Sequence, residues 1–187
     1  MSATETLTTT DLPAAGTYGL DVSHSHVGFK VRHLMVSKVR GRFADFEGNV
    51  TIAEDPLQSS VDVTVQLASI DTRDAGRDEH LRSADFFDVG NNPTMTYRSS
   101  GVREVGKGRF VVDGDLTLKG VTKQVALTVT FDGNATDPWG NARAAFTATA
   151  EIDREDFGLT WNQALEAGGV LVAKLVEIEI EAEAVKQ

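Results

Sequence analysis

Strict alternation of apolar and polar side chains runs along most of this 187-residue chain and constrains its fold more than any other feature. In residues 61–68, VDVTVQLA, every second side chain is apolar, and the same period of two recurs in residues 109–118, 121–131, 142–152 and 170–184. A period of two places the apolar side chains of a strand on one face of a sheet. Because no βαβ unit separates these segments, the pattern predicts an all-β protein of eight or nine antiparallel strands, either an extended barrel or a two-sheet sandwich.

One connection between these segments also predicts their register. Only two residues, Lys119 and Gly120, separate two of the strands, which indicates a two-residue hairpin. The residues that flank such a turn pair directly and share a face, so Leu118 is expected opposite Val121.

Residues 36–53 alternate as well, but the parity of their apolar side chains changes near Ala44 and Asp45. A β-bulge is the usual device that shifts parity within a strand, and it also bends the strand. We therefore expect one long, bulged strand that helps the sheet to close.

The alternation stops at residues 69–88, SIDTRDAGRDEHLRSADFFD, which predicts a helical segment near residues 71–88. Asp71 or Thr72 is suited to cap the helix N-terminus. Gly76 costs about 1 kcal/mol relative to alanine, so the helix needs tertiary contacts to stay ordered. The side chains expected to dock it on the barrel, as a plug or a lid, are Leu81, Phe86 and Phe87.

The length suits a single domain, and no linker-like stretch divides it. We expect residues 1–16 to form a flexible N-terminal leader and residues 17–187 to form the barrel domain. The leader has no basic start and no long apolar run, so neither a secretory signal nor a membrane anchor is predicted. A cytoplasmic protein is the corresponding expectation.

Composition excludes several functional classes. The net charge of −10 argues against general nucleic-acid binding, which needs a basic contact face. The absence of cysteine removes disulfides, thiolate catalysis and cysteine-based metal sites. No phosphate-binding loop, dinucleotide fingerprint or serine-nucleophile motif occurs either.

Several motifs occur in a fixed order along the chain. They are HSHVGFKVRH at 24–33, SIDT at 69–72, HLRS and DFFD within 80–88, and GDLTLKGVTKQV at 114–125. Together they resemble the YceI-like family, described as lipocalin-like polyisoprenoid-binding proteins, over about residues 16–185. The resemblance implies an extended antiparallel barrel with a long cavity for an isoprenoid or other lipid chain, and neither catalytic residues nor a cofactor. Members from Gram-negative bacteria usually carry a periplasmic signal peptide, which is not predicted here, and often have Trp where this chain has Tyr18.

The inward-facing side chains either fill the barrel or line a cavity. Alternation alone favours a filled interior, because the side chains of eight strands are enough to fill a barrel, whereas the resemblance favours a cavity. The small inner residues expected to leave room are Gly41, Gly48, Gly114, Ala144, Ala148 and Ala150. The side chains predicted to line the cavity are Val27, Phe29, Val31, Val63, Val65, Tyr97, Phe110, Val112, Leu127, Val129, Phe146, Ala148, Ile178 and Ile180.

Three polar residues, His24, His26 and Asp71, are candidates for a hydrogen-bonding cluster at one end of the barrel. His24 and His26 are predicted on one face of a strand, as a metal pair requires. However, His33 has the opposite parity and His80 is distant in the sequence, so no metal site is predicted.

The charged residues of the helical segment are interpreted as ion pairs on a solvated helix. They are Asp71, Asp74, Asp78 and Glu79, with Arg73, Arg77 and Arg82. A calcium-binding loop does not match this spacing, because Arg73 and Ala75 occupy positions that require ligands.

Five basic residues are expected on one outer surface: Lys30, Arg32, Lys38, Arg40 and Arg42. One interpretation is attraction of an isoprenoid diphosphate or weak contact with an anionic membrane. The favoured alternative is cross-strand ion pairing with the four glutamates of residues 177–183. Exposed strand edges and the family resemblance also suggest a homodimer.

The leading functional hypothesis is non-catalytic binding, carriage or storage of a long isoprenoid or fatty lipid in the barrel. A second hypothesis is an enzyme acting on a small apolar substrate with His24, His26 or Asp71 as acid and base, which requires a polar pair facing the cavity. A third is a stress-related interaction domain, which requires a filled barrel.

Overall fold

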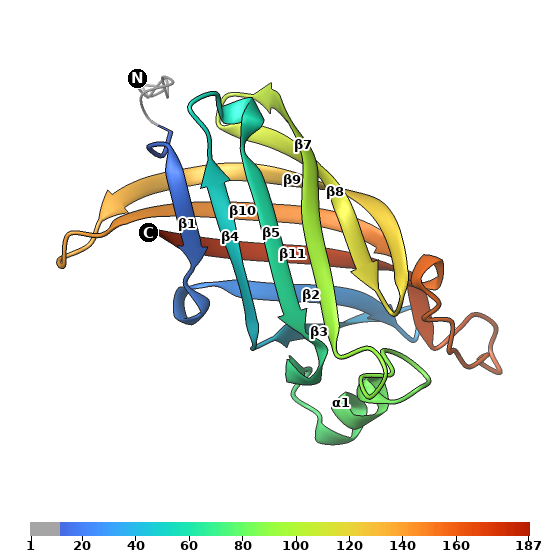
Figure 1. Cartoon of the computed structure of the whole chain (residues 1–187). Helices are drawn as coiled ribbons and strands as arrows, with labels where there is room; N and C mark the ends of the chain where they lie inside the picture. The colour runs from blue at the N-terminus through green and yellow to red at the C-terminus, as the bar shows by residue number, and fades with distance from the viewer. Residues whose placement is uncertain (1–11) are drawn as a thin grey trace, which may run out of the picture.

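The computed structural model describes residues 12–187, which form one eleven-stranded sheet and one α-helix (Figure 1). The strands are β1 (Gly16–Leu20), β2 (His26–His33), β3 (Ser37–Phe43), β4 (Phe46–Ile52), β5 (Ser60–Gln66), β6 (Ile70–Asp71), β7 (Thr94–Gly106), β8 (Arg109–Leu118), β9 (Val121–Thr136), β10 (Ala142–Asp153) and β11 (Val172–Lys186). The helix is α1 (Ala75–Arg82), and the short 3-10 helices are η2 (Val22–His24), η3 (Pro56–Gln58), η4 (Leu67–Ser69) and η5 (Arg154–Phe157). No helix among these residues combines the length and apolar character that a membrane crossing requires.

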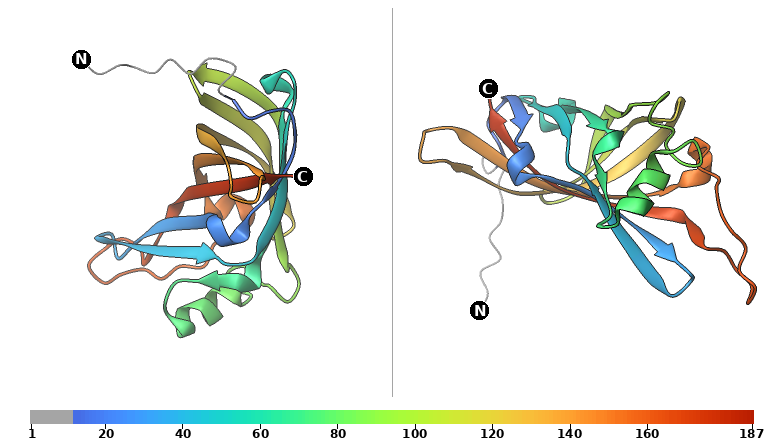
Figure 2. Two further views of the ribbon diagram at one scale, coloured as in Figure 1. Left: turned by 90° about the vertical axis from the view of Figure 1, so that its left-hand side faces the viewer. Right: turned by 90° about the horizontal axis from the view of Figure 1, so that it is seen from below.

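Eight of the strands close into an antiparallel, lipocalin-like barrel. The hydrogen-bonded order is β1-β4-β5-β7-β8-β9-β10-β11, and β11 returns to β1 through pairs such as Ala184 with Leu20. The remaining strands, β2, β3 and β6, continue the sheet from the earlier part of β11, where Ile178 pairs with Phe29. The β2–β3 hairpin therefore projects from the barrel body (Figure 2). The predicted all-β barrel is confirmed, with three strands beyond the closed ring.

The predicted hairpin register is also confirmed. Leu118 pairs with Val121, and both turn residues between them adopt positive φ angles, 52° at Lys119 and 75° at Gly120. Two positive φ angles mark a type I′ turn, whose twist matches that of the flanking strands.

The predicted long strand over residues 36–53 is wrong. The chain turns a corner at Ala44 and Asp45 and divides into β3, which pairs with β2 and β6, and β4, which pairs with β1 and β5. The parity change marks this exchange of neighbours, because Phe43 and Phe46 both turn inward and are 6% and 3% exposed.

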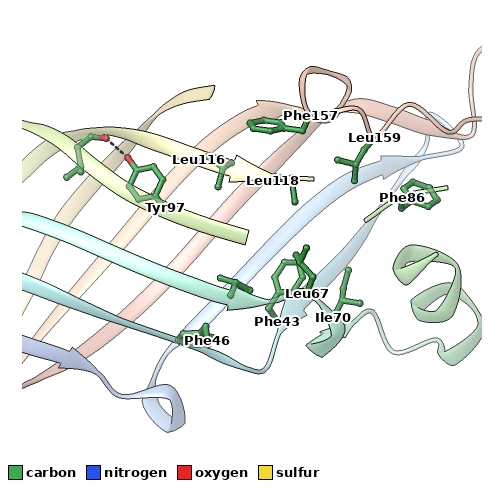
Figure 3. Packing of buried hydrophobic residues seen from close by; sticks show 12 residues of the cluster. Phe43, Phe46, Leu67, Ile70, Phe86, Tyr97, Leu116, Leu118, Phe157 and Leu159 are labelled. Carbon is green, nitrogen blue, oxygen red and sulfur yellow. Dashed lines mark hydrogen bonds between the residues drawn. The ribbon is translucent and has the colours of Figure 1, made fainter. Parts of the chain in front are cut away.

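One end of the barrel is closed by a packed hydrophobic core (Figure 3). Its most deeply buried large side chains are Leu67, Ile70 and Phe157, and Phe86 joins them from the segment after α1. The core therefore fills the end of the barrel next to α1.

Arg154, in η5 after β10, forms a buried polar anchor. Its side chain is 5% exposed and donates hydrogen bonds to four backbone carbonyls: Nη1 to Leu159 (2.6 Å) and Trp161 (2.9 Å), Nε to Ala173 (2.8 Å) and Nη2 to Val172 (3.3 Å). Its guanidinium thus joins the loop after η5 to the start of β11.

Candidate functional site

The barrel interior contains a cavity of about 230 Å³. All eight strands of the ring contribute side chains to its wall. Val27 of β2 and residues before β1, before β2 and around η3 complete it. The lining side chains are Leu12, Pro13, Leu20, Ser25, Val27, Phe46, Val50, Ile52, Pro56, Ser59, Ser60, Val61, Val63, Val65, Met95, Tyr97, Val102, Phe110, Val112, Leu116, Val125, Leu127, Val129, Phe131, Phe146, Ala148, Ile178, Ile180 and Ala182. None of these lining residues is charged.

The hydroxyl groups on this wall are largely engaged with the backbone. The Tyr97 hydroxyl shares its one proton between the carbonyls of Val112 (3.1 Å) and Val125 (2.9 Å), and the bond to Val112 is drawn in Figure 3. Burial raises the pKa of Tyr97, so its hydroxyl stays protonated at neutral pH. Ser25 Oγ donates to the carbonyl of Glu183, and Ser59 Oγ accepts from a backbone N–H. The cavity therefore offers mainly hydrocarbon to a ligand.

Of the fourteen side chains predicted to line a cavity, twelve lie on this wall, and the exceptions are Phe29 and Val31. Both belong to β2, which lies outside the closed ring and reaches the cavity only at Val27. Their parity is the same as that of Val27, but they lie along the projecting hairpin rather than over the barrel. The ring of Phe29 packs instead against Phe43, with 5.7 Å between the ring centroids.

Most of the small inner residues do not line the cavity as predicted. Of the six, only Ala148 lies on the cavity wall. Gly41 lies under the ring of Phe29, and a Cβ on Gly114 would come within 2.5 Å of Tyr97 Cζ. These two glycines accommodate neighbouring aromatic rings, so they do not provide space for a ligand.

The wall also includes residues outside the predicted set. Leu12 and Pro13 come from the predicted leader, whose residues 1–11 lie outside the described part of the chain. The hydroxyl of Tyr18 donates to the carbonyl of Ala14 (2.8 Å), which holds this stretch against β1. Of the other fifteen lining residues, six share the parity of a predicted residue on the same strand, so the alternation contained the signal for these six: Val61, Met95, Leu116, Val125, Phe131 and Ala182.

The helical segment is anchored at the packed end. The helix N-cap is Asp74, which accepts from the backbone N–H of Arg77 (2.9 Å), so the predicted caps Asp71 and Thr72 are wrong. Thr72 instead donates to the Asp78 carboxylate through its hydroxyl (2.6 Å) and its backbone N–H (2.9 Å). Asp78 is 7% exposed.

The predicted ion pairs on a solvated helix are also wrong for these residues, because three of the charged side chains bind the neighbouring loop. Asp78 accepts from Thr72, and Arg77 donates to the backbone carbonyl of Thr72 (2.7 Å). Arg82 donates to the carbonyls of Ala68 (3.0 Å) and Ile70 (3.2 Å).

Of the lid candidates, Phe86 is buried in the core, and Leu81 and Phe87 pack against it. None of the three is on the cavity wall.

We expect amide exchange in α1 to stay unchanged when the cavity is filled, because the anchors of the helix are all at the packed end. Hydrogen exchange with mass spectrometry, with and without farnesol, measures this, and wall strand β4 serves as the internal reference that should slow. Slowing in residues 75–87 equal to that in β4 would support a lid.

The three polar candidates do not form one cluster on the cavity. His24 belongs to η2 rather than to a strand, so the predicted shared face with His26 is wrong. His26 is exposed on β2, and Asp71 pairs with Arg42 (3.3 Å) at the outer edge of the sheet. None of these candidates is a lining residue.

His24 instead joins an ionic network near the end of β11. Its Nδ1 lies 2.8 Å from Asp21, and Arg143 Nη1 bridges Asp21 (2.8 Å) and Glu183 (2.9 Å). Hydrogen bonds from Ser23, Arg143 and His24 hold the pKa of Asp21 well below its usual range. The charge of Asp21 therefore stabilises the fold at neutral pH, and this contribution is lost as the pH falls.

The same network contains the metal-ligand candidates found among the described residues. Ligand atoms of Asp21, His24 and Glu183 lie within 4.8 Å of one another. Arg143 already donates to the carboxylates of Asp21 and Glu183. Its positive charge therefore offsets the charge of the two carboxylates, as a metal cation would. The arrangement is accounted for as an ion-pair network.

The five predicted basic residues lie on one face of β2 and β3, where Lys30 pairs with Arg40 and Arg32 with Lys38. Strand β11 lies beside β2, as the ion-pair interpretation requires. Its glutamates bind two of the lysines: Glu179 pairs with Lys30, and Glu177 with Lys38 (2.8 Å). Cross-strand ion pairing is confirmed for these two lysines.

The closed barrel and its apolar cavity define the class of the protein as a lipocalin-like β-barrel. The chain belongs to the YceI-like family, whose domain model matches residues 18–184. It is 43% identical to a UPF0312 protein of Ectopseudomonas mendocina over 149 residues, 78% of each chain, and 45% identical to one of Serratia proteamaculans over 138 residues, 73% and 71% of the two chains.

Solved structures share this fold. The YCEI protein of Campylobacter jejuni is 29% identical, with a TM-score of 0.72 over 90% of this chain and 96% of that one. BcnA of Burkholderia cenocepacia is 24% identical, with a TM-score of 0.77 over 88% and 98% of the two chains. A polyisoprenoid binding domain of Saccharophagus degradans is 14% identical, with a TM-score of 0.71 over 93% and 100%. These last two likenesses concern the fold.

Proposed function

We propose that this protein binds the hydrocarbon chain of an isoprenoid or similar lipid in the barrel cavity, as a non-catalytic carrier or store. The observation that carries the proposal is a wall of about thirty side chains without a charged group, whose Tyr97 hydroxyl is already bonded to two carbonyls. Such a wall offers a polar ligand few partners, whereas it is favourable for hydrocarbon. The YceI-like membership and the polyisoprenoid binding domain of similar fold agree with this ligand class.

The energy available from such a cavity is sufficient for tight binding. Each buried CH₂ contributes about 0.8 kcal/mol, so one five-carbon isoprene unit contributes about 3–4 kcal/mol before ordering costs. At about 230 Å³ the cavity is slightly smaller than the range of about 300–1,000 Å³ typical of ligand pockets. We therefore propose that it encloses a few isoprene units of the ligand rather than a whole long polyprenol.

The enzymatic alternative requires an acid and a base that face the bound substrate. His24, His26 and Asp71 all lie off the cavity wall, and no other titratable carboxylate or imidazole of residues 12–187 lines it. The interaction-domain alternative requires a filled barrel, which the cavity of about 230 Å³ does not favour. Both observations favour the carrier proposal.

Native mass spectrometry of protein purified without added lipid tests the proposal. We expect bound mass that organic extraction identifies as an isoprenoid or long-chain lipid, in about one copy per chain. The stripped protein should then take up geraniol, farnesol and geranylgeraniol with affinity that rises and then levels off, because only the enclosed units contribute. A stripped protein that binds none of these alcohols would contradict the proposal, as would preferential uptake of a polar analogue.

A further inference from the structure

The turn between β2 and β3 has an unusual composition for its backbone geometry. Leu34 and Met35 have φ angles of 53° and 63°, and the N–H of Val36 donates to the carbonyl of His33 (3.2 Å). Two positive φ angles at the centre of a tight hairpin define the type I′ pattern, which Asn-Gly adopts without strain. For Leu and Met the left-handed region is strained. In the Lys119-Gly120 turn, which also has two positive φ angles, one of the two residues is a glycine.

The strained turn presents apolar side chains to solvent. Leu34, Met35 and Val36 are 42%, 52% and 81% exposed. The loop before β11 lies beside them, since the N–H of Leu34 donates to the carbonyl of Leu171 (2.9 Å), and it adds Val170, which is 36% exposed. We call Leu34, Met35, Val36 and Val170 the apolar tip. Its first three residues lie at the end of the hairpin that projects from the barrel (Figure 2), and none of its four residues lines the cavity.

Basic side chains stand directly behind the apolar tip. The facing pair Arg32 and Lys38 lies two residues from the turn, which is about 7 Å along a strand at about 3.3 Å per residue. Arg40 lies one pair farther back on the same face. Lys38 is paired with Glu177, but no carboxylate of residues 12–187 is within ion-pair distance of Arg32 or Arg40. Both arginines are exposed.

We propose that the apolar tip docks the protein on an anionic lipid surface. Interfacial elements bury their apolar side chains about 5–10 Å into the boundary between headgroups and acyl chains. At that depth, cations about 7 Å behind the tip reach the negatively charged headgroups. A second copy of the chain is a poorer partner, because two tips would bring their arginines together. The strain retained at Leu34 and Met35 is explained if the exposed side chains have a function.

The double substitution Leu34→Asn with Met35→Gly separates docking from folding. It supplies the residues that a type I′ turn favours, so the thermal midpoint should rise, whereas two of the four apolar tip residues are lost. Co-sedimentation with vesicles of phosphatidylcholine and phosphatidylglycerol (7:3) should show binding of the wild type and at least ~tenfold weaker binding of the variant. Binding of the wild type should fall in 0.5 M salt and on pure phosphatidylcholine, because the arginines contribute through charge.

A matched control removes an exposed apolar side chain elsewhere. Trp139, in the β9–β10 turn, is 80% exposed, and Trp139→Ser should bind the charged vesicles as the wild type does. The proposal is overturned if the double variant binds equally well, if Trp139→Ser loses binding to the same extent, or if pure phosphatidylcholine binds as strongly as the charged mixture. It is also overturned if sedimentation velocity shows that the double substitution dissolves a dimer while vesicle binding is absent.

Discussion

Replacing Ala148 with phenylalanine should strongly weaken the binding of isoprenoid alcohols. Ala148 lies in the middle of β10, is 7% exposed, and pairs with Val129 and Ile180, which also line the cavity. A phenyl ring at this position would occupy the space proposed for an isoprene unit. Losing one unit removes about 3–4 kcal/mol of gross burial energy, and after ordering costs we expect the affinity for farnesol to fall about 10- to 100-fold. Titration of the stripped protein with farnesol measures this loss.

The matched control is Thr149→Phe, the next position on the same strand. Thr149 is exposed and faces outward, so the same ring adds no bulk to the cavity. Overpacking at Ala148 costs about 1–3 kcal/mol of stability, and circular dichroism should show both variants folded at the titration temperature. Unchanged farnesol affinity in a folded Ala148→Phe variant would place the ligand elsewhere.

The alternation predicted an all-β barrel or sandwich because side-chain parity is a local property of a strand, and the family resemblance favoured the barrel. The alternation also fixed the pairing of Leu118 with Val121, where a two-residue turn left one register. Parity could not distinguish a bulge from a corner at Ala44 and Asp45, since both reverse the inward face. Only the partners of β3 and β4, which come from distant parts of the chain, decide between the two.

Parity also does not show which strands close the ring, and this explains the two residues wrongly predicted to line the cavity. Phe29 and Val31 have the right parity, but parity does not reveal that β2 lies outside the closed ring and reaches the cavity only at Val27. The sequence also gave no sign that Asp78 and Arg154 are buried, because charged residues are usually solvated. Their burial depends on carbonyls and N–H groups that the fold brings within reach.

Arg154 should be the most important of these buried polar residues for stability. Substitution Arg154→Met keeps much of the side-chain volume but removes the donors of four hydrogen bonds to backbone carbonyls. Burial already lowers the pKa of the guanidinium, yet an arginine stays charged, so the native site is a charge held by carbonyl dipoles. Carbonyls left without a donor in the interior are costly, and we expect unfolding free energy to fall by about 3–5 kcal/mol. For a chain of this length the thermal midpoint should drop by about 6–20 °C.

Two further variants show whether the loss comes from the fixed donor geometry of Arg154. Arg154→Lys keeps the charge but has a single nitrogen, so it cannot reach four carbonyls and should recover only part of the midpoint. Arg40→Met removes an exposed arginine and should change stability by no more than about 0.5 kcal/mol. If Arg154→Met melts within about 2 °C of the wild type by differential scanning calorimetry, the carbonyls must find other donors, and the loop after η5 does not depend on this guanidinium. A large drop restored fully by lysine would instead assign the stabilisation to charge alone.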